Sequence, residues 1–230
     1  MVQPELYGHR GAAGEAPENT ANALAHLLRT GARRIEIDLR LSRDREVVVV
    51  HDSSIRRLSG RPGRISSLTA ETLGRCAPPV PTLRDLILAG PGIEHWQLEI
   101  KPIAAAHRGL LIRKLVRTLR PLTDHAVRFT ATSSSAAVLA ALKAHCPALP
   151  RGVVVEHPGA FAYLPRFASR LAVVNLHLLS RWRVQHLQRS GIEVSVWTIK
   201  RWSEYVRARR LGVNSVIADH PQALMRALAG

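Results

Sequence analysis

Nine short strand-like segments alternate with longer amphipathic stretches along this 230-residue chain, and this alternation is the strongest constraint on its fold. The strand candidates lie at 5–8, 34–39, 46–51, 96–101, 127–131, 152–155, 172–176, 193–198 and 215–218. Helix candidates lie between most of them, at 20–30, 82–88, 108–119, 135–145, 180–189, 202–211 and 221–228. Glycine stands just past three of these helices, where it commonly ends one. The alternation predicts a parallel sheet with helices outside it.

One junction between strands has no room for a helix. Segments 34–39 and 46–51 are separated only by residues 40–45, which predicts a β-hairpin around Asp44-Arg45. A two-residue turn there would place Asp38 opposite His51 and Arg40 opposite Val49. Without the return strand of this hairpin, eight parallel strands remain. Eight is the number that closes a β/α barrel.

The length, the cysteines and the first residues favour a single cytoplasmic domain covering residues 1–230. Barrels of the β/α type routinely use this length as one domain. Cys76 and Cys146 have no metal-ligand spacing, so ordinary thiols in a reducing compartment are expected. The opening MVQPELYGHRG lacks the long apolar core of a signal peptide, and no apolar run is long enough to span a bilayer.

The formal net charge is +16, with 29 arginines and only four lysines. Two explanations stay open for this balance. It suits anionic partners such as phosphate esters or an anionic membrane surface, and it also fits a general preference for arginine codons. The arginines are scattered, and no basic block, zinc finger or RNA-binding aromatic motif is present. A nucleic-acid partner is therefore not expected, and the oligomeric state stays open.

Alternation within RRIEIDLRLS puts two carboxylates on one face of a predicted strand. Glu36 and Asp38 share that face, and Ile35 and Ile37 share the other. If the isoleucines pack under helices, both carboxylates point into the barrel, where they repel each other unless a cation lies between them. The stretch WQLEIKP repeats the pattern and aims Glu99 inward. Oxygen ligands suit Mg²⁺ or Ca²⁺. An edge strand with its polar face in water is the alternative.

Two histidines, His9 and His51, each lie at the end of a predicted strand. The loop that His9 opens could also be an ordinary connection with polar residues in water. The ends of barrel strands are nevertheless where catalytic groups collect. Phosphodiester cleavage needs such a set: one imidazole takes a proton from a nucleophilic hydroxyl or water, and the other protonates the leaving alkoxide. A cation with Arg10 or Lys101 would neutralise charge on the phosphoryl oxygens.

The ordered motifs along the chain resemble those of the glycerophosphodiester phosphodiesterase family. The matching segments are HRG at 9–11, PENT at 17–20, EID at 36–38, HD at 51–52, LEIK at 98–101, VWTIK at 196–200 and GVNSVIAD at 212–219. The resemblance implies an α/β fold, a TIM-type (β/α)8 barrel of the phospholipase C-like phosphodiesterase kind. The barrel would carry the β-hairpin extension after strand 2 and a short insertion, 52–98, over the active site.

The resemblance also implies roles for individual residues. His9 and His51 would be the catalytic acid/base pair, with His9 as the base. Glu36, Asp38 and Glu99 would hold the divalent cation. Contacts with the substrate would come from Arg10 and Lys101 at the phosphate and from Trp197 in the pocket; a core tryptophan that fills the barrel is an equal alternative for Trp197.

The implied activity is metal-dependent hydrolysis of a glycerophosphodiester to an alcohol and glycerol 3-phosphate. A cyclic phosphate is expected on the way, because a hydroxyl next to the phosphorylated carbon has an intramolecular advantage over water and the sequence offers no obvious additional base to position a water. Because the insertion is short, the site would be more open, and the substrate could be a lysolipid cleaved in a lysophospholipase D-like reaction. A barrel that binds anionic surfaces or nucleic acid without turnover is a third possibility. The pair of proton-transfer groups argues against it, since a binder has no use for them.

Overall fold

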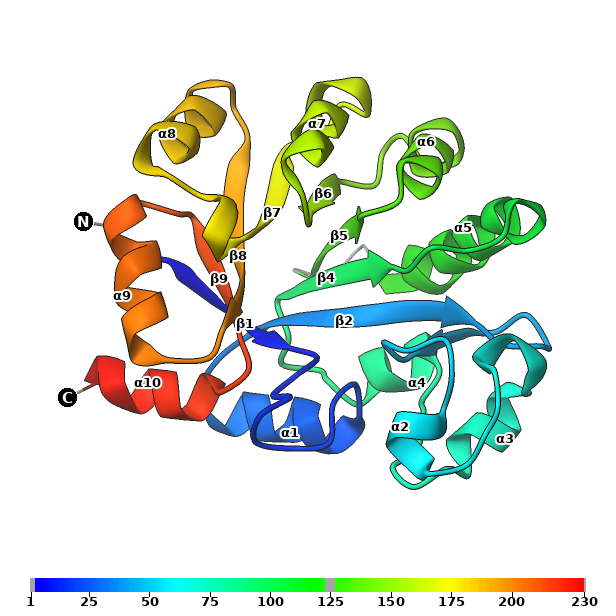
Figure 1. Ribbon diagram of the computed structural model, residues 1–230. Helices are drawn as coiled ribbons and strands as arrows, with labels where there is room; N and C mark the ends of the chain where they lie inside the picture. The colour runs from blue at the N-terminus through cyan, green and yellow to red at the C-terminus, as the bar shows by residue number, and fades with distance from the viewer. Residues whose placement is uncertain (1–2, 123–126, 230) are drawn as a thin grey trace.

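The computed structural model describes residues 3–122 and 127–229 and contains a closed barrel of eight parallel strands (Figure 1). The barrel strands are β1 (Glu5–His9), β2 (Arg34–Leu41), β4 (His95–Ile100), β5 (Arg128–Ser133), β6 (Arg151–Val155), β7 (Leu171–Asn175), β8 (Glu193–Ile199) and β9 (Ser215–Ala218). Each strand pairs with the next, and pairing of β1 with both β9 and β2 closes the ring. The predicted TIM-type barrel is confirmed.

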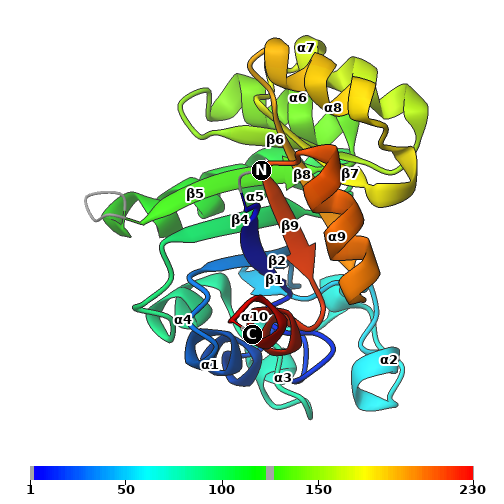
Figure 2. The same cartoon turned by 90° about the vertical axis from the view of Figure 1, so that its left-hand side faces the viewer.

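Helices cover the outside of this ring. The described helices are α1 (Ala21–Arg29), α2 (Arg56–Ser59), α3 (Ala70–Gly74), α4 (Leu83–Leu88), α5 (Ala105–Leu119), α6 (Ala136–His145), α7 (Tyr163–Arg166), α8 (Arg181–Arg189), α9 (Trp202–Leu211) and α10 (Pro221–Ala229). Single 3₁₀ turns lie at Ile65–Ser67, Arg120–Leu122, Pro158–Ala162 and Leu176–Leu178. Figure 2 shows α10 beside α1, so the first and last helices meet on one side of the barrel. No helix in the described residues is long and apolar enough to cross a membrane.

The outer face of strand β2 is apolar and is buried under helix α1. Ile35, Ile37 and Leu39 are at most 1% exposed and pack in one apolar cluster with Leu24 and Leu27 of α1. The alternate residues of β2 therefore face the interior of the barrel, as the sequence pattern predicts. Burying the outer face of this strand under helices fixes which of its residues can reach the barrel axis.

The hairpin after β2 exists, but its predicted register is wrong by one residue. The return strand β3 (Val47–Val49) pairs Leu39 with Val49 and Leu41 with Val47, and the Val50 amide bonds to the Asp38 carbonyl. His51 is therefore not opposite Asp38. The turn has three residues, because Ser42 and Glu46 close it and Arg45 adopts a left-handed φ of 66°. A type I turn followed by a left-handed residue is the common three-residue hairpin, usually with glycine in that last position.

Residues between β3 and β4 form the predicted insertion. Its short helices α2 and α3 were not predicted, because four or five residues are too few for a helical apolar pattern. The segment holds its own small core, in which Val48 and Val50 pack with Ile55, Ile65 and Leu73. Since β3 lies on the same edge of β2 as β1, the insertion stands beside the C-terminal end of β1.

Candidate active site

The C-terminal ends of the barrel strands surround a small hollow of about 60 Å³. Seven of the eight residues singled out from the sequence line it: His9, Arg10, Glu36, His51, Glu99, Lys101 and Trp197. The eighth, Asp38, adjoins the hollow, because one of its carboxylate oxygens lies within 4.8 Å of oxygens of Glu36 and Glu99. The hollow is also lined by Gln97 and Glu156 and by three inward-facing apolar residues of β6, β7 and β9: Val154, Val173 and Ile217.

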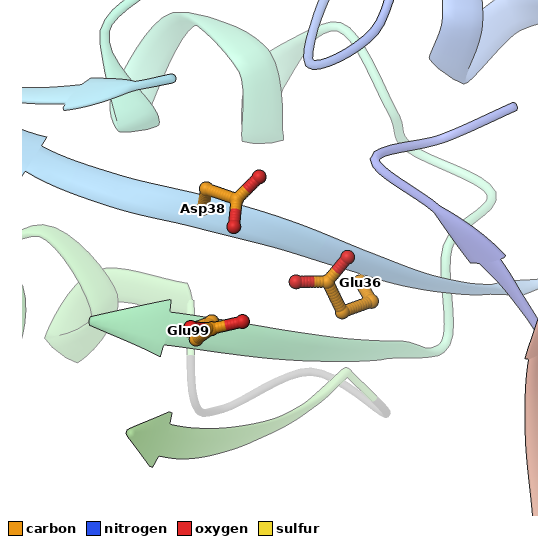
Figure 3. A group of neighbouring side chains, drawn as sticks. All are labelled: Glu36, Asp38 and Glu99. Atoms are coloured by element: carbon orange, nitrogen blue, oxygen red, sulfur yellow. The ribbon is translucent and has the colours of Figure 1, made fainter. Parts of the chain in front are cut away.

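Three carboxylates from two neighbouring strands converge at this point (Figure 3). Glu36 and Asp38 come from β2 and Glu99 from β4, where Asp38 pairs directly with Glu99. Burial raises the pKa of Glu36 well above its ordinary value, and the charges of Asp38 and Glu99 raise it further. Burial also raises the pKa of Glu99, against the opposing effect of Lys101. The cluster therefore favours a bound proton or a cation.

One carboxylate oxygen of this cluster, Glu36 Oε1, is buried and has no hydrogen-bond partner among the described residues. A buried oxygen without a partner loses its hydration with nothing in return, unless a ligand occupies its free lone pairs. The three side chains offer only hard oxygen donors, which match the preferences of Mg²⁺ and Ca²⁺. The residues present therefore fit a divalent cation.

Asp38 stays ionised because basic groups surround it. Lys101 Nζ lies 2.8 Å from Asp38 Oδ1, and Arg10 Nε lies 3.2 Å from Oδ2. The Asn19 side-chain amide also donates to Oδ2 at 2.9 Å. Burial alone would raise the pKa of Asp38, but the charges of Lys101, Arg10 and His51 lower it below the ordinary value. Lys101 Nζ also lies 2.6 Å from Glu99 Oε1, so one ammonium bridges two strands.

The HRG loop at residues 9–11 is closely packed, and neither Gly8 nor Gly11 has space for a side chain. A Cβ added to Gly8 would lie 1.9 Å from the carbonyl oxygen of Gly11, and one added to Gly11 would lie 2.8 Å from the Ala23 side chain. Gly11 also has a φ of +89°, which glycine adopts without strain. Arg10 itself has a φ of 50°, which turns its backbone amide toward Glu36 Oε2 at 3.2 Å. The glycines thus let the chain reverse directly beside the carboxylate cluster.

His9 is held by a carboxylate from the other end of the chain. Its Nδ1 lies 2.5 Å from Asp219 Oδ1, just after β9. Burial raises the pKa of Asp219, but the hydrogen bond with His9 and the charges of His9, Lys200 and Arg10 together outweigh it, and the net pKa is lowered. An ionised carboxylate can only accept, so Nδ1 carries the proton. The other ring nitrogen, Nε2, lies 3.9 Å from Glu36 Oε2.

His51 has a matching arrangement. Its Nδ1 lies 2.8 Å from Asp52 Oδ1, and Arg57 Nε donates to Asp52 Oδ2 at 2.5 Å. Arg57 also makes two bonds to Glu18, at 2.6 and 3.1 Å, and Glu18 accepts from Arg10 Nη1 at 3.0 Å. An ion-pair chain therefore links the insertion, through α2, to the loop after β1.

Several of these residues were not singled out from the sequence. Asp219, Asp52, Glu18 and Asn19 lie within the quoted motifs GVNSVIAD, HD and PENT, but sequence order alone does not place them beside the histidines or Asp38. Arg57 lies in no motif. Trp197 lines the hollow, and its Nε1 donates to the Val173 carbonyl at 3.1 Å. Its contact with the substrate stays a prediction.

A much larger cavity, about 960 Å³, opens at the other end of the barrel. The starts of the strands line it, including Tyr7, His95 and Arg128. Among its described lining residues there is no group of carboxylates and histidines like the one at the C-terminal end. The chemistry of a barrel of this kind is found at the C-terminal ends of its strands, so the smaller hollow is the candidate active site.

Comparison with known proteins agrees with this geometry. A model of the glycerophosphoryl diester phosphodiesterase family matches residues 9–223. Human lysophospholipase D GDPD3 is 26% identical over 95% of this chain and 83% of its own length. A glycerophosphodiester phosphodiesterase of Caldanaerobacter subterraneus subsp. tengcongensis is 24% identical over 96% of both chains. The structure of an Oleispira antarctica phosphodiesterase in complex with the product sn-glycerol-3-phosphate has a TM-score of 0.91 at 24% identity, covering 99% of this chain and 98% of that one. The chain belongs to the glycerophosphoryl diester phosphodiesterase family and is a phosphodiesterase.

Proposed function

We propose that this protein hydrolyses glycerophosphodiesters to an alcohol and glycerol 3-phosphate, with His9 and His51 as the acid/base pair. The observation that carries the proposal is the shared hollow. It is lined by two histidines, each with Nδ1 fixed by its own aspartate, and by two members of the buried carboxylate cluster. Two imidazoles with fixed orientation can move two protons in one displacement at phosphorus. The related Oleispira antarctica phosphodiesterase was solved with sn-glycerol-3-phosphate, the product of such a reaction.

A divalent cation, Mg²⁺ or Ca²⁺, would be held by Glu36, Asp38 and Glu99. When bound, it would neutralise negative charge that develops on the phosphoryl oxygens. The chain's own cations act in the same region, since Lys101 and Arg10 both lie against Asp38 on the edge of the hollow. Their positive charge would orient the phosphate before the reaction.

The glycerol of the substrate supplies its own nucleophile, a hydroxyl next to the phosphorylated carbon. His9 Nε2 takes the proton of this hydroxyl, whose oxygen bonds to phosphorus while the bond from phosphorus to the alcohol oxygen breaks. His51 Nε2 gives its proton to the leaving alkoxide. A cyclic phosphate remains, and water then opens it with the two histidines in exchanged roles. An internal hydroxyl has a large advantage over water, with an effective molarity that can reach about 10⁵ M or more.

A substrate analogue without the adjacent hydroxyl tests this route. It should still bind through Arg10 and Lys101, yet release its alcohol very slowly compared with the normal glycerophosphodiester. Detection of a cyclic phosphate by ³¹P NMR during turnover of the normal substrate would support the same step. Turnover of the analogue at the normal rate would show direct attack by water and would refute the proposed role of the hydroxyl.

A lysophospholipid is the second candidate substrate, cleaved in a lysophospholipase D-like reaction. The similarity to human lysophospholipase D GDPD3 favours it, as does the short insertion beside the hollow, which would leave room for an acyl chain. Glycerophosphocholine and a lysophospholipid should be compared with EDTA and with added Mg²⁺ or Ca²⁺. We expect turnover to need the cation with both substrates. Binding of either without turnover would instead support a non-catalytic anion-binding barrel.

A further inference from the structure

Two tryptophans stand exposed on neighbouring helices of the barrel. Trp182 in α8 is 68% exposed and Trp202 in α9 is 46% exposed. Each indole stacks on a ring of its own helix, Trp182 on His186 and Trp202 on Tyr205, with ring centroids 5.2 Å apart in both pairs. Their orientation is therefore fixed while much of each indole is exposed to solvent. Exposed apolar side chains that lie close together are typical of an interaction surface and are not needed for folding.

Both tryptophans lie at the end of the barrel that carries the hollow. Each stands in the first turn of the helix that follows a barrel strand, α8 after β7 and α9 after β8. Trp202 follows closely after Trp197, which lines the hollow. Between them, Lys200 Nζ lies 3.9 Å from Asp219, the partner of His9. The exposed indoles therefore lie at the same end of the barrel as the candidate active site.

The same two helices are strongly basic. Together α8 and α9 contain six arginines and a single acidic residue, Glu204. The Glu204 carboxylate already accepts bonds from the backbone amides of Lys200 and Arg201, at 2.7 and 3.1 Å. A shallow hollow of about 470 Å³ joins the helices and is lined by Arg181, Trp202, Ser203, Val206, Arg207, Arg210 and Leu211.

Within the described part of the chain, Arg181, Arg207 and Arg210 form no ion pair or side-chain hydrogen bond. They line the same shallow hollow as Trp202, and Arg181 adjoins Trp182 in sequence. We name these five side chains the tryptophan rim: Trp182, Trp202, Arg181, Arg207 and Arg210. Its chemistry is indole rings among unpaired guanidinium groups.

We propose that the tryptophan rim docks the protein on an anionic lipid bilayer. Indole rings prefer the headgroup level of a bilayer, where the ring body is apolar and its N–H meets water. Unpaired arginines are attracted to the negative potential of anionic lipids. Docking would turn the mouth of the hollow toward the bilayer, so that a lysophospholipid headgroup could enter from the membrane. Only this last consequence rests on the proposed function.

Co-sedimentation with vesicles tests the docking. Wild type should bind vesicles that contain phosphatidylglycerol, and binding should be weak on phosphatidylcholine alone and should fall with added salt. Removing the three rim arginines together (Arg181→Gln, Arg207→Gln and Arg210→Gln) should lower the partition constant by up to about fivefold for each. The pair Trp182→Ala and Trp202→Ala should lower it at least tenfold.

Control variants separate the rim from general charge and hydrophobicity. Leu88→Ala removes an apolar side chain of α4 that is 62% exposed. Arg117→Gln removes the charge of an exposed arginine of α5. Both should bind vesicles like wild type. If the rim variants also bind like wild type, or if the controls lose as much, the tryptophan rim is not the docking surface. Equal binding to neutral vesicles would likewise overturn the proposal.

Kinetics on two substrates separate this proposal from the proposed function. The rim variants should hydrolyse soluble glycerophosphocholine at the wild-type rate but lose turnover of a lysophospholipid embedded in phosphatidylglycerol vesicles. Equal loss on both substrates would contradict a docking role. If wild type hydrolyses neither substrate, the proposed function fails, while the vesicle-binding result still decides the docking proposal.

Discussion

Asp219 accepts a hydrogen bond from Nδ1 of His9 at 2.5 Å, although 210 residues separate the two in sequence. Closure of the barrel creates this pair, because β1 carries His9 and β9 leads to Asp219, and these strands pair side by side. The contact fixes the tautomer of His9 and leaves Nε2 free to take a proton in the hollow.

Replacing Asp219 should therefore disable His9 without unfolding the protein. We expect Asp219→Ala to lower kcat by about 10- to 100-fold, and Asp219→Asn by at least as much, since an amide can stabilise the wrong tautomer. Steady-state kinetics on glycerophosphocholine measures the effect. Asp85→Asn, in an exposed residue of the first turn of α4, is the matched control. A normal kcat in Asp219→Asn would show that His9 needs no orientation.

How far the sequence predicts this site depends on whether a contact lies along one strand or between distant segments. Alternation along one strand is enough to place Glu36 and Asp38 inside the barrel, because helices must bury Ile35 and Ile37. The Asp219 contact depends on which strands close the ring, and no local pattern contains that information. The hairpin register fails for a related reason: Arg45 adopts a left-handed φ that the sequence pattern of this turn does not suggest.

Substituting either histidine of the proposed pair should remove most of the turnover. His9→Ala and His51→Ala should each lower kcat by roughly 10²–10⁴-fold, the usual contribution of a positioned acid or base. The double variant should lose far less than the product of the two effects, because both groups act in one transition state. Independent, multiplicative losses would contradict a concerted pair, and a near-normal rate in His9→Ala would return the HRG loop to a structural role.

The carboxylate cluster predicts cation binding that strengthens as pH rises. Burial and the neighbouring carboxylates raise the pKa of Glu36, so a cation competes there with a proton. Affinity for Mg²⁺ or Ca²⁺ should increase with pH until Glu36 is ionised, and binding should release protons. Isothermal titration in buffers of different ionisation enthalpy measures both quantities. Glu36→Gln should weaken binding and abolish the proton release that Glu36 contributes; binding that is independent of pH in wild type would contradict the assignment.

We predict that Arg57, in the insertion, supports catalysis by holding Asp52 and Glu18 in place. It bonds to Asp52, the partner of His51, and to Glu18, the partner of Arg10. Arg57→Gln should lower kcat roughly tenfold with little change in thermal unfolding temperature, because its supporting bonds hold another hydrogen-bonded group in place. Arg57→Lys should restore part of the rate.

The neighbouring residue supplies a matched control for Arg57. Arg56 is exposed on the same short helix, and its side chain forms no ion pair with the described residues. Arg56→Gln should leave kcat unchanged. If Arg56→Gln and Arg57→Gln lower kcat equally, the effect comes from the charge of the insertion and not from the bonds to Asp52 and Glu18.

Because His95 is partly buried, we predict that the free energy of unfolding falls in mild acid. Its ring bonds to Tyr7 and Thr130 at the start of the barrel, and burial, helped by the charges of Arg128 and Arg34, lowers its pKa to about 4. An unfolded histidine titrates near 6.5. Between these values the unfolded chain binds more protons, so the free energy of unfolding rises with pH across this window. The full contribution is present above pH about 6.5 and is lost as pH falls to about 4; it amounts to at most about 3 kcal/mol.

Denaturant unfolding from pH 4 to 7 should therefore show a shallower pH dependence in His95→Gln than in wild type. His107→Gln, in an exposed histidine of α5, should keep the wild-type slope. Parallel curves for wild type and His95→Gln would mean that His95 titrates alike in the folded and unfolded chain.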